Sequence, residues 1–282
     1  MRPTSLLGPT RAFLSFIRRT RDTNPLYQKH IMTRKIISGM MNRFHGSPLL
    51  TTRRTPVSNP TLALPSPSDA KLLPHAHYPS FFSPSLVSRI LSECSYISKT
   101  LSGTVTLTGP KRGRWSTSYL HTAHAFQNRN PDIHSSLITL ASSVSSSLNW
   151  CLFTPTLSTR CVEYHTVGVT GGLPQKEHHD HGSAITVDVM LQEPLSGGAF
   201  KTHALDSSGI LREVSVPFKV GDAVVFPSHK YHWVEHVTEG ERKVLIMELW
   251  EGPERACNHR CEIFQGQCGY KKKAVHSHFI GM

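Results

Sequence analysis

The chain has 282 residues, of which 38% are hydrophobic and 18% charged, so it is long and apolar enough to bury a core. Its formal net charge of +12 sits largely at the N-terminus, because the first 70 residues hold 11 basic residues and two acids. The remaining residues are close to neutral, and we therefore expect no nucleic-acid-binding body. We also expect no membrane-spanning helix and no disulfide-built scaffold, because long uncharged apolar runs are lacking and only six cysteines are present.

The N-terminal segment, residues 1–59, is rich in Arg, Ser and Thr and contains one acid. This composition is typical of an organelle transit peptide. Its Arg content suits a mitochondrial presequence, and its Ser and Thr content suits a plastid one. Two alternatives stay open: a disordered basic tail, or an extended gene model with its true start at Met32, Met40 or Met41, which would leave the protein cytoplasmic.

Proline and serine dominate the next stretch, residues 60–80, which we predict to be an extended, poorly packed linker. The body is predicted over residues 81–252, and a cysteine-containing tail over residues 253–282. The division therefore predicts one folded domain with extended segments on both sides.

Two amphipathic helices open the predicted body. The first follows the N-cap Ser83, begins at Pro84 and ends at Gly103, with apolar residues at three- and four-residue steps. The second runs from about Pro131 to Asn149, with one apolar face and one serine-rich face. Both helices are predicted to bury one face against the rest of the body.

From Cys161 onward, short β-branched or aromatic runs alternate with glycine-containing turns, which is a pattern of strands. The predicted strands cover residues 161–167, 184–191, 199–204, 213–218, 223–227, 231–237 and 243–250. Strands that follow helices, rather than alternating with them, favour an antiparallel sandwich or barrel over a parallel sheet.

One pair of metal-binding residue types, His178 and Asp180, stands just ahead of a predicted strand. In an extended chain these two side chains point to the same side, so they can bind one cation. His232, 52 residues after Asp180, offers a third ligand at the head of another strand. Two histidines and one carboxylate on one face of an octahedron leave three positions open, as in non-haem Fe(II) oxygenases. His236 is the rival third ligand, disfavoured because it precedes Arg242 by only six residues.

Arg242 follows His232 by ten residues across a predicted turn, so its guanidinium can return to the same cavity and bind a dicarboxylate. These residues, with Gly197-Gly198 and the run Gly221–Pro227, resemble the Fe(II)/2-oxoglutarate dioxygenases of the prolyl and lysyl hydroxylase type. The resemblance covers roughly residues 84–252. Arginine at position 242 is nearer to the lysyl hydroxylases than to the collagen prolyl hydroxylases.

The resemblance implies a mainly β (α+β) fold, a double-stranded β-helix of the jelly-roll or cupin type buttressed by N-terminal helices. It implies that His178, Asp180 and His232 bind Fe(II). It also implies that Arg242 binds the distal carboxylate of 2-oxoglutarate and that Tyr164 hydrogen-bonds this cosubstrate, although Tyr164 also fits a core aromatic role.

The expected cofactors are Fe(II), 2-oxoglutarate and O2, with ascorbate as a further candidate. The expected reaction is hydroxylation of a C–H bond in a prolyl or lysyl side chain of a peptide, or in a small molecule, with release of succinate and CO2. Oxidative demethylation by the same site, or a non-catalytic barrel that binds a ligand, are the alternatives. The basic run 111–115 either grips an acidic substrate or faces solvent.

Near the C-terminus, three cysteines and a histidine fall within twelve residues: Cys257, His259, Cys261 and Cys268. Such a set can bind zinc, although the spacing is not that of a usual zinc finger. It can equally form one disulfide with a free thiol, or stay as three reduced cysteines, and the sequence leaves all three states open.

Overall fold

The computed structural model describes residues 67–109, 113–148, 150, 157–263, 266 and 268. The predicted transit peptide, Lys111-Arg112 and the chain after Cys268 lie outside the described residues. Within the described part of the chain, no helix is long and apolar enough to cross a membrane.

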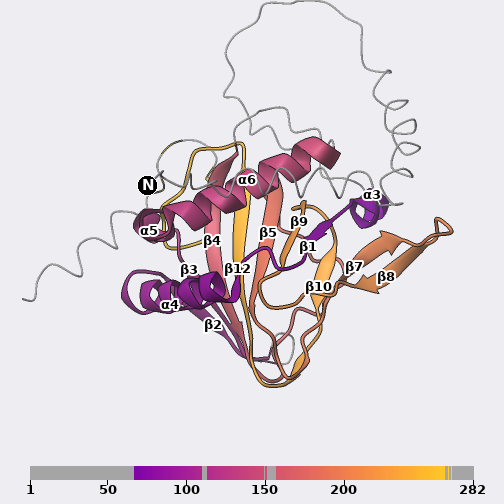
Figure 1. The fold of residues 1–282 in the computed structure, drawn as a ribbon, viewed down its shortest axis with the longest axis horizontal. Helices are drawn as coiled ribbons and strands as arrows, with labels where there is room; N and C mark the ends of the chain where they lie inside the picture. Colours follow the sequence, from indigo (N-terminus) through magenta and orange to yellow (C-terminus); the bar gives the residue numbers. More distant parts are fainter. Residues whose placement is uncertain are drawn as a thin grey trace, which may run out of the picture. The chain divides into compact units, whose positions relative to one another are not determined.

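The main architectural element is a large antiparallel sheet, whose strands lie side by side in the centre of Figure 1. Its strands, in spatial order, are β1 (Ala76–Tyr78), β9 (Ala223–Pro227), β5 (Ile185–Gln192), β12 (Arg242–Trp250), β4 (Ser158–Val167), β3 (Trp115–Tyr119) and β2 (Thr104–Leu107). A smaller sheet has the order β10 (His232–Val234), β7 (Phe200–Leu205) and β8 (Leu211–Ser215), and β11 (Val237–Glu239) pairs with β6 (Ser196–Gly197).

The interior of the fold lies between the large sheet and the smaller ones. Its apolar core joins residues from both: Trp115, Val167, Leu173, Met190, Phe200, Val216, Phe218, Val224, Phe226, Val234, Val237 and Val244. This mainly β architecture is the predicted double-stranded β-helix. Strand β5 is buried on both faces, so that alternate residues of one strand reach either the interior or the helices.

Helices cover the outer face of the large sheet. Helix α4 (Pro84–Thr100) and helix α6 (Pro131–Leu148) both contact β5 and bury the apolar faces predicted for them, including Ile90 and Leu137. Figure 1 shows α6 lying across the strands of this sheet. The short helix α5 (Ala125–Arg129) and the 3-10 turn η1 (Thr122–His124) connect β3 to α6.

Part of the stretch predicted to be a poorly packed linker belongs to the folded body. It contains helix α3 (Pro67–Leu72) and strand β1, which pairs with β9. His77 Nε2 lies 2.8 Å from Asp222 Oδ2, and the buried Lys230 donates a hydrogen bond to the carbonyl of Leu73. The proline count led to the wrong expectation because these prolines flank the short elements instead of interrupting them.

Two predicted strands differ from the observed ones. The strand predicted over 213–218 ends at Ser215, because Pro217 has no N–H to donate to a ladder. The strand predicted over 231–237 is divided into β10, which pairs with β7, and β11, which pairs with β6. Strands β2 and β3 were not predicted.

Candidate metal centre

The three predicted metal ligands, His178, Asp180 and His232, meet at the end of the barrel interior. Each offers one ligand atom, and these atoms all lie within 4.8 Å of one another. His178 Nε2 is 3.4 Å from Asp180 Oδ1, and His232 Nε2 is 3.9 Å from Asp180 Oδ2. Two imidazole nitrogens and a carboxylate therefore converge on one point, as the spacing predicts.

Backbone hydrogen bonds hold the ligand-bearing segments together. The N–H of His232 donates to the carbonyl of His178 at 3.0 Å, and the N–H of Asp180 donates to the carbonyl of Ser228 at 2.8 Å. His232 Nδ1 donates to the carbonyl of Lys230 at 3.0 Å, so its Nε2 carries the free lone pair. His232 therefore presents to the centre the nitrogen that a metal ion needs.

The protonation states of these ligands also suit a cation. Burial lowers the pKa of His232 to about 4 against the opposing charge of Asp180, so the imidazole is neutral. Burial alone would raise the pKa of Asp180, but His232, His178 and Arg260 together hold that pKa well below its usual range. The Oγ1 of Thr186 also donates to Asp180 Oδ2 at 2.7 Å. The carboxylate is thus ionised and fixed in orientation.

The rival ligand His236 lies elsewhere. It is exposed, and its Nδ1 donates to the carbonyl of Thr170 at 2.8 Å. Strand β10 ends at Val234, so the two-residue alternation that would have put His236 on the same face as His232 does not extend to it.

Arg242 begins strand β12 and is only 1% exposed. Its guanidinium carbon lies 6.0 Å from the ring centroid of Phe218, and its Nε and Nη2 have no hydrogen-bond partner among the described residues. Burial lowers the pKa of Arg242 to about 10, with Asp188 opposing, so the side chain is charged at neutral pH. A buried cation with unpaired donors is unfavourable on its own, which makes this position suited to an anion.

Asp188 of strand β5 lies between the triad and Arg242 of the neighbouring strand β12. Thr186, opposite Glu248 on β12, reaches Asp180, and Asp188 stands two residues further along the same face, opposite Ile246. Burial, reinforced by the charge of Asp180, raises the pKa of Asp188 to about 8. This carboxyl group is therefore largely protonated at neutral pH and can donate a hydrogen bond.

Tyr164 points away from the triad, contrary to the prediction. Along β4, Glu163 and His165 contact each other on the interior face at 2.7 Å, so Tyr164 between them faces the opposite side. There its hydroxyl interacts with Thr166 and with Ser95 of helix α4. The tyrosine is a core aromatic, which is the alternative that the sequence left open.

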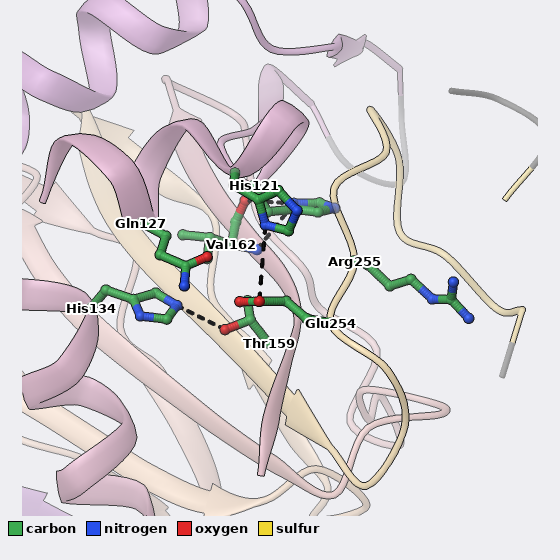
Figure 2. A pocket seen from close by; sticks show the side chains of 8 residues that line it. His121, Gln127, His134, Thr159, Val162, Glu254 and Arg255 are labelled. Atoms are coloured by element: carbon green, nitrogen blue, oxygen red, sulfur yellow. Dashed lines mark hydrogen bonds and ion pairs between the residues drawn. The ribbon is translucent and has the colours of Figure 1, made fainter. Parts of the chain in front are cut away.

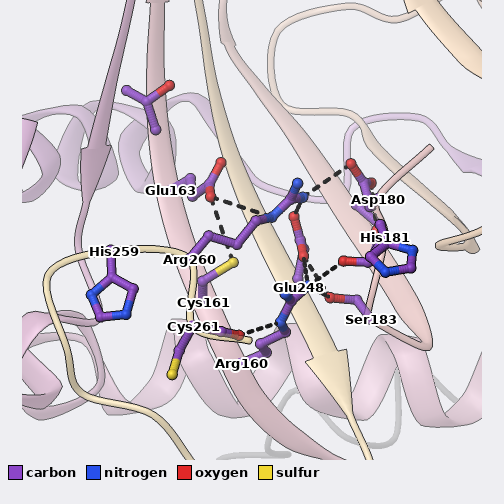
Figure 3. A network of polar contacts seen from close by, with 12 residues as sticks. Arg160, Cys161, Glu163, Asp180, His181, Ser183, Glu248, His259, Arg260 and Cys261 are labelled. Carbon is purple, nitrogen blue, oxygen red and sulfur yellow. Dashed lines mark hydrogen bonds and ion pairs between the residues drawn. The ribbon is translucent and has the colours of Figure 1, made fainter. Parts of the chain in front are cut away.

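A charge network that the sequence did not reveal adjoins the triad (Figure 3). The guanidinium of Arg260 contacts Glu248, lies 3.1 Å from Asp180 Oδ1 and has its Nε 3.8 Å from Glu163. Arg160, also buried, donates to Glu248 at 3.2 Å and to Ser183 at 2.8 Å. The sequence signal for this network is an acid within a buried strand, Glu163 in β4 and Glu248 in β12.

A separate pocket lies between α5, α6, β4 and the C-terminal segment (Figure 2). None of its lining residues belongs to the triad. His134 Nε2 is 2.8 Å from Thr159 Oγ1, and His121 accepts from the N–H of Val162 at 3.1 Å. The pocket is therefore distinct from the metal centre.

No protein-family model matches the sequence, and no curated protein matches it. Among solved structures, the fold is similar to that of SnoN, a non-haem alpha-ketoglutarate-dependent epimerase from nogalamycin biosynthesis, with a TM-score of 0.50 and 17% identity over 66% of this chain and 81% of SnoN. SnoN in complex with Fe3+, alpha-ketoglutarate and nogalamycin RO gives a TM-score of 0.51 and 14% identity over 67% of this chain and 85% of that one. A Pseudomonas putida prolyl-4-hydroxylase gives a TM-score of 0.45 and 16% sequence identity over 67% of this chain and 97% of the hydroxylase. The similarity to SnoN establishes a shared fold.

Proposed function

We propose that the chain is an Fe(II)- and 2-oxoglutarate-dependent dioxygenase that hydroxylates a C–H bond and releases succinate and CO2. The observation that carries the proposal is the buried guanidinium of Arg242, whose Nε and Nη2 have no partner in the described part of the chain. It lies in the interior that also holds two histidines and a carboxylate on one face. The fold shared with SnoN, which binds iron and alpha-ketoglutarate, supports the same assignment.

The triad fits an Fe(II) ion by its donor set. His178 Nε2, His232 Nε2 and the Asp180 carboxylate would hold it, and their placement on one side leaves positions for other ligands. An Fe(II) ion held there would supply open coordination positions and redox chemistry, while 2-oxoglutarate and the substrate would supply the electrons that reduce O2. The protein keeps His232 neutral and Asp180 ionised, so both are ready to bind a cation.

The far side of the interior fits the cosubstrate. Arg242 offers a planar pair of donors that matches a carboxylate, which is the group at the distal end of 2-oxoglutarate. Asp188 nearby would repel this carboxylate if it were ionised, but its pKa of about 8 keeps it largely neutral. Phe218 and Phe200 line the same region with apolar rings and exclude water from the charge pair.

The substrate we propose is a prolyl or lysyl side chain of a peptide, or a small molecule. Support comes from the surroundings of His178, where the half-buried ring of His179 contacts the half-buried rings of His229 and Tyr231. These rings form an aromatic surface that suits a flat or apolar substrate group. The β7–β8 hairpin, which extends beyond the large sheet in Figure 1, is a second surface available to a peptide.

An anaerobic titration of the protein with Fe(II) and 2-oxoglutarate tests the cofactor assignment. We expect a weak metal-to-ligand charge-transfer band in wild type and its loss in Asp180→Ala. Arg242→Lys keeps the charge but loses the planar fork, so we expect the 2-oxoglutarate concentration at half-saturation to rise at least about tenfold. Arg212→Ala is the matched control, because Arg212 is exposed and pairs with Asp206 on the surface.

A folded protein that shows no band with iron and 2-oxoglutarate would refute the proposal, as would unchanged half-saturation in Arg242→Lys. Succinate release with peptide and small-molecule panels then identifies the substrate. Formaldehyde release in the same assays would assign demethylation instead of stable hydroxylation.

A further inference from the structure

The C-terminal segment brings together four metal-binding side chains: Cys257, His259, Cys261 and Cys268. One ligand atom from each lies within 4.8 Å of the others. Cys268 Sγ is 3.5 Å from His259 Nε2. In a tetrahedral site with Zn–S of about 2.3 Å and Zn–N of about 2.0 Å, the sulfur–nitrogen edge measures about 3.5 Å. The observed separation therefore matches two ligands of one zinc ion.

The cysteines of this cluster are buried and reduced. Cys257, Cys261 and Cys268 are at most 6% exposed, and all are free thiols. A disulfide would join two of the sulfurs, but it would not account for the third sulfur and the imidazole lying beside them. Convergence of all four donors on one region is instead what a closed, four-coordinate metal site requires.

The protein also fixes the backbone that carries these ligands. The carbonyl of His259 accepts from His121 Nε2 at 3.2 Å, and the carbonyl of Cys261 accepts from Arg160 Nε at 2.9 Å. Arg255 donates to the carbonyls of Gly266 and Ile263, within the loop that leads to Cys268. Its positive charge suits a centre in which three thiolates and Zn2+ leave one net negative charge.

We propose that Cys257, His259, Cys261 and Cys268 form a structural Zn2+ site, separate from the His178–Asp180–His232 centre. The protein supplies four ligands, so no position stays open for a substrate and the role is structural. The proposal does not depend on the proposed function of the barrel.

This zinc site determines the position of Arg260. His259 and Cys261 are the chain neighbours of Arg260, and Figure 3 shows their side chains directed away from the three carboxylates that the guanidinium contacts. Two ligands on a metal fix the backbone on both sides of Arg260. The zinc site thereby holds a cation beside Asp180 of the other metal centre.

The test is the metal content of the full-length protein, purified under reducing conditions from cells grown with zinc and measured by plasma mass spectrometry. We expect one zinc per chain in wild type and in Asp180→Ala, which removes a ligand of the other centre only. Cys261→Ser should lose zinc, whereas His259→Cys should keep it because four donors remain. Cys94→Ala is the matched control, since Cys94 is a buried thiol of helix α4 outside the cluster.

Substitution of wild-type protein with Co(II) tests the site without any variant. Four-coordinate cobalt with thiolate ligands gives intense visible bands and sulfur-to-metal charge transfer, and X-ray absorption should count three sulfurs and one nitrogen. Wild-type protein that contains no zinc and gives no tetrahedral cobalt spectrum would overturn the proposal. Full retention of zinc in folded Cys261→Ser, or its loss in Asp180→Ala, would overturn it as well.

Discussion

Arg260 Nη2 lies 3.1 Å from Asp180 Oδ1, the same carboxylate oxygen that faces His178 Nε2 at 3.4 Å. A residue from the C-terminal segment thus shares a carboxylate with the candidate metal centre. The same guanidinium also contacts Glu248 and lies near Glu163, so one cation serves three buried acids. The charge balance of the barrel interior depends on a segment that the sequence placed outside the folded body.

The first prediction concerns this balance. Arg260→Ala leaves Glu248 and Glu163 buried with less positive charge around them, so we expect the free energy of unfolding to fall by about 3–5 kcal/mol. Urea unfolding of protein purified with zinc and without added iron measures this loss without a contribution from bound iron. Arg89→Ala, which removes an exposed pair with Asp132, should cost less than about 1 kcal/mol. Equal stability of the two variants would contradict the expectation.

The second prediction separates the two histidines that compete for the third ligand position. His232→Ala should lose bound Fe(II), because it removes the buried Nε2 that faces Asp180. His236→Ala should keep it, because His236 is exposed and bonds to Thr170. Iron content after anaerobic loading and gel filtration measures both, and loss of iron from the His236 variant alone would reverse the assignment.

The third prediction is a pH effect on stability. Burial raises the pKa of Asp188 to about 8, whereas an unfolded chain has an aspartate pKa of about 3.9. The native state therefore binds this proton more tightly, and the stabilisation from this group is lost as pH rises from about 4 to about 8. The amide in Asp188→Asn cannot ionise, so the free energy of unfolding of this variant should rise relative to that of wild type as the pH increases across this range.

Urea unfolding of both proteins at about pH 5, 6.5 and 8, purified with zinc and without added iron, measures this difference. The gain should level off above about pH 8, where Asp188 is ionised in both states of the wild type. Parallel stability curves for the two proteins would show that Asp188 ionises normally in the folded state.

The fourth prediction concerns strand β1. A chain that starts at Pro67 keeps α3 and β1 and serves as the reference. A chain that starts at Phe81 loses the bonds from His77 and from the N–H of Ser80 to the buried Asp222. We expect this second truncation to lower the free energy of unfolding by at least about 1–3 kcal/mol. Equal urea midpoints for the two truncated chains would show that β1 contributes nothing.

The sequence predicted the parts of the fold that have strong periodicity. The buried faces of α4 and α6 follow from three- and four-residue spacing, and β9 was predicted at its observed bounds of Ala223–Pro227. The triad was predictable because His178 and Asp180 are local in sequence and His232 heads its own strand.

Long-range contacts account for what the sequence missed. Arg260 is a surface-type residue in a segment without regular structure, and only the tertiary fold brings it to Glu248. Tyr164 was misplaced because the resemblance names a position, whereas the two-residue alternation of β4 determines its direction. Strand β2 has only four residues, Thr-Val-Thr-Leu, and is exposed along its whole length, so its short alternating run buries no face that would mark it as part of the core.

The hydrogen bond from the N–H of His232 to the carbonyl of His178, and that from His232 Nδ1 to Lys230, organise the ligands before any ion arrives. Because the ligands of such a site are already in place, no conformational change on binding discriminates among divalent ions. For nitrogen and oxygen ligands, Co2+, Ni2+ and Cu2+ bind more tightly than Fe2+. We therefore expect these ions to displace iron from the triad, so that the metal supply of the compartment, and not the donor set, determines which ion the protein carries.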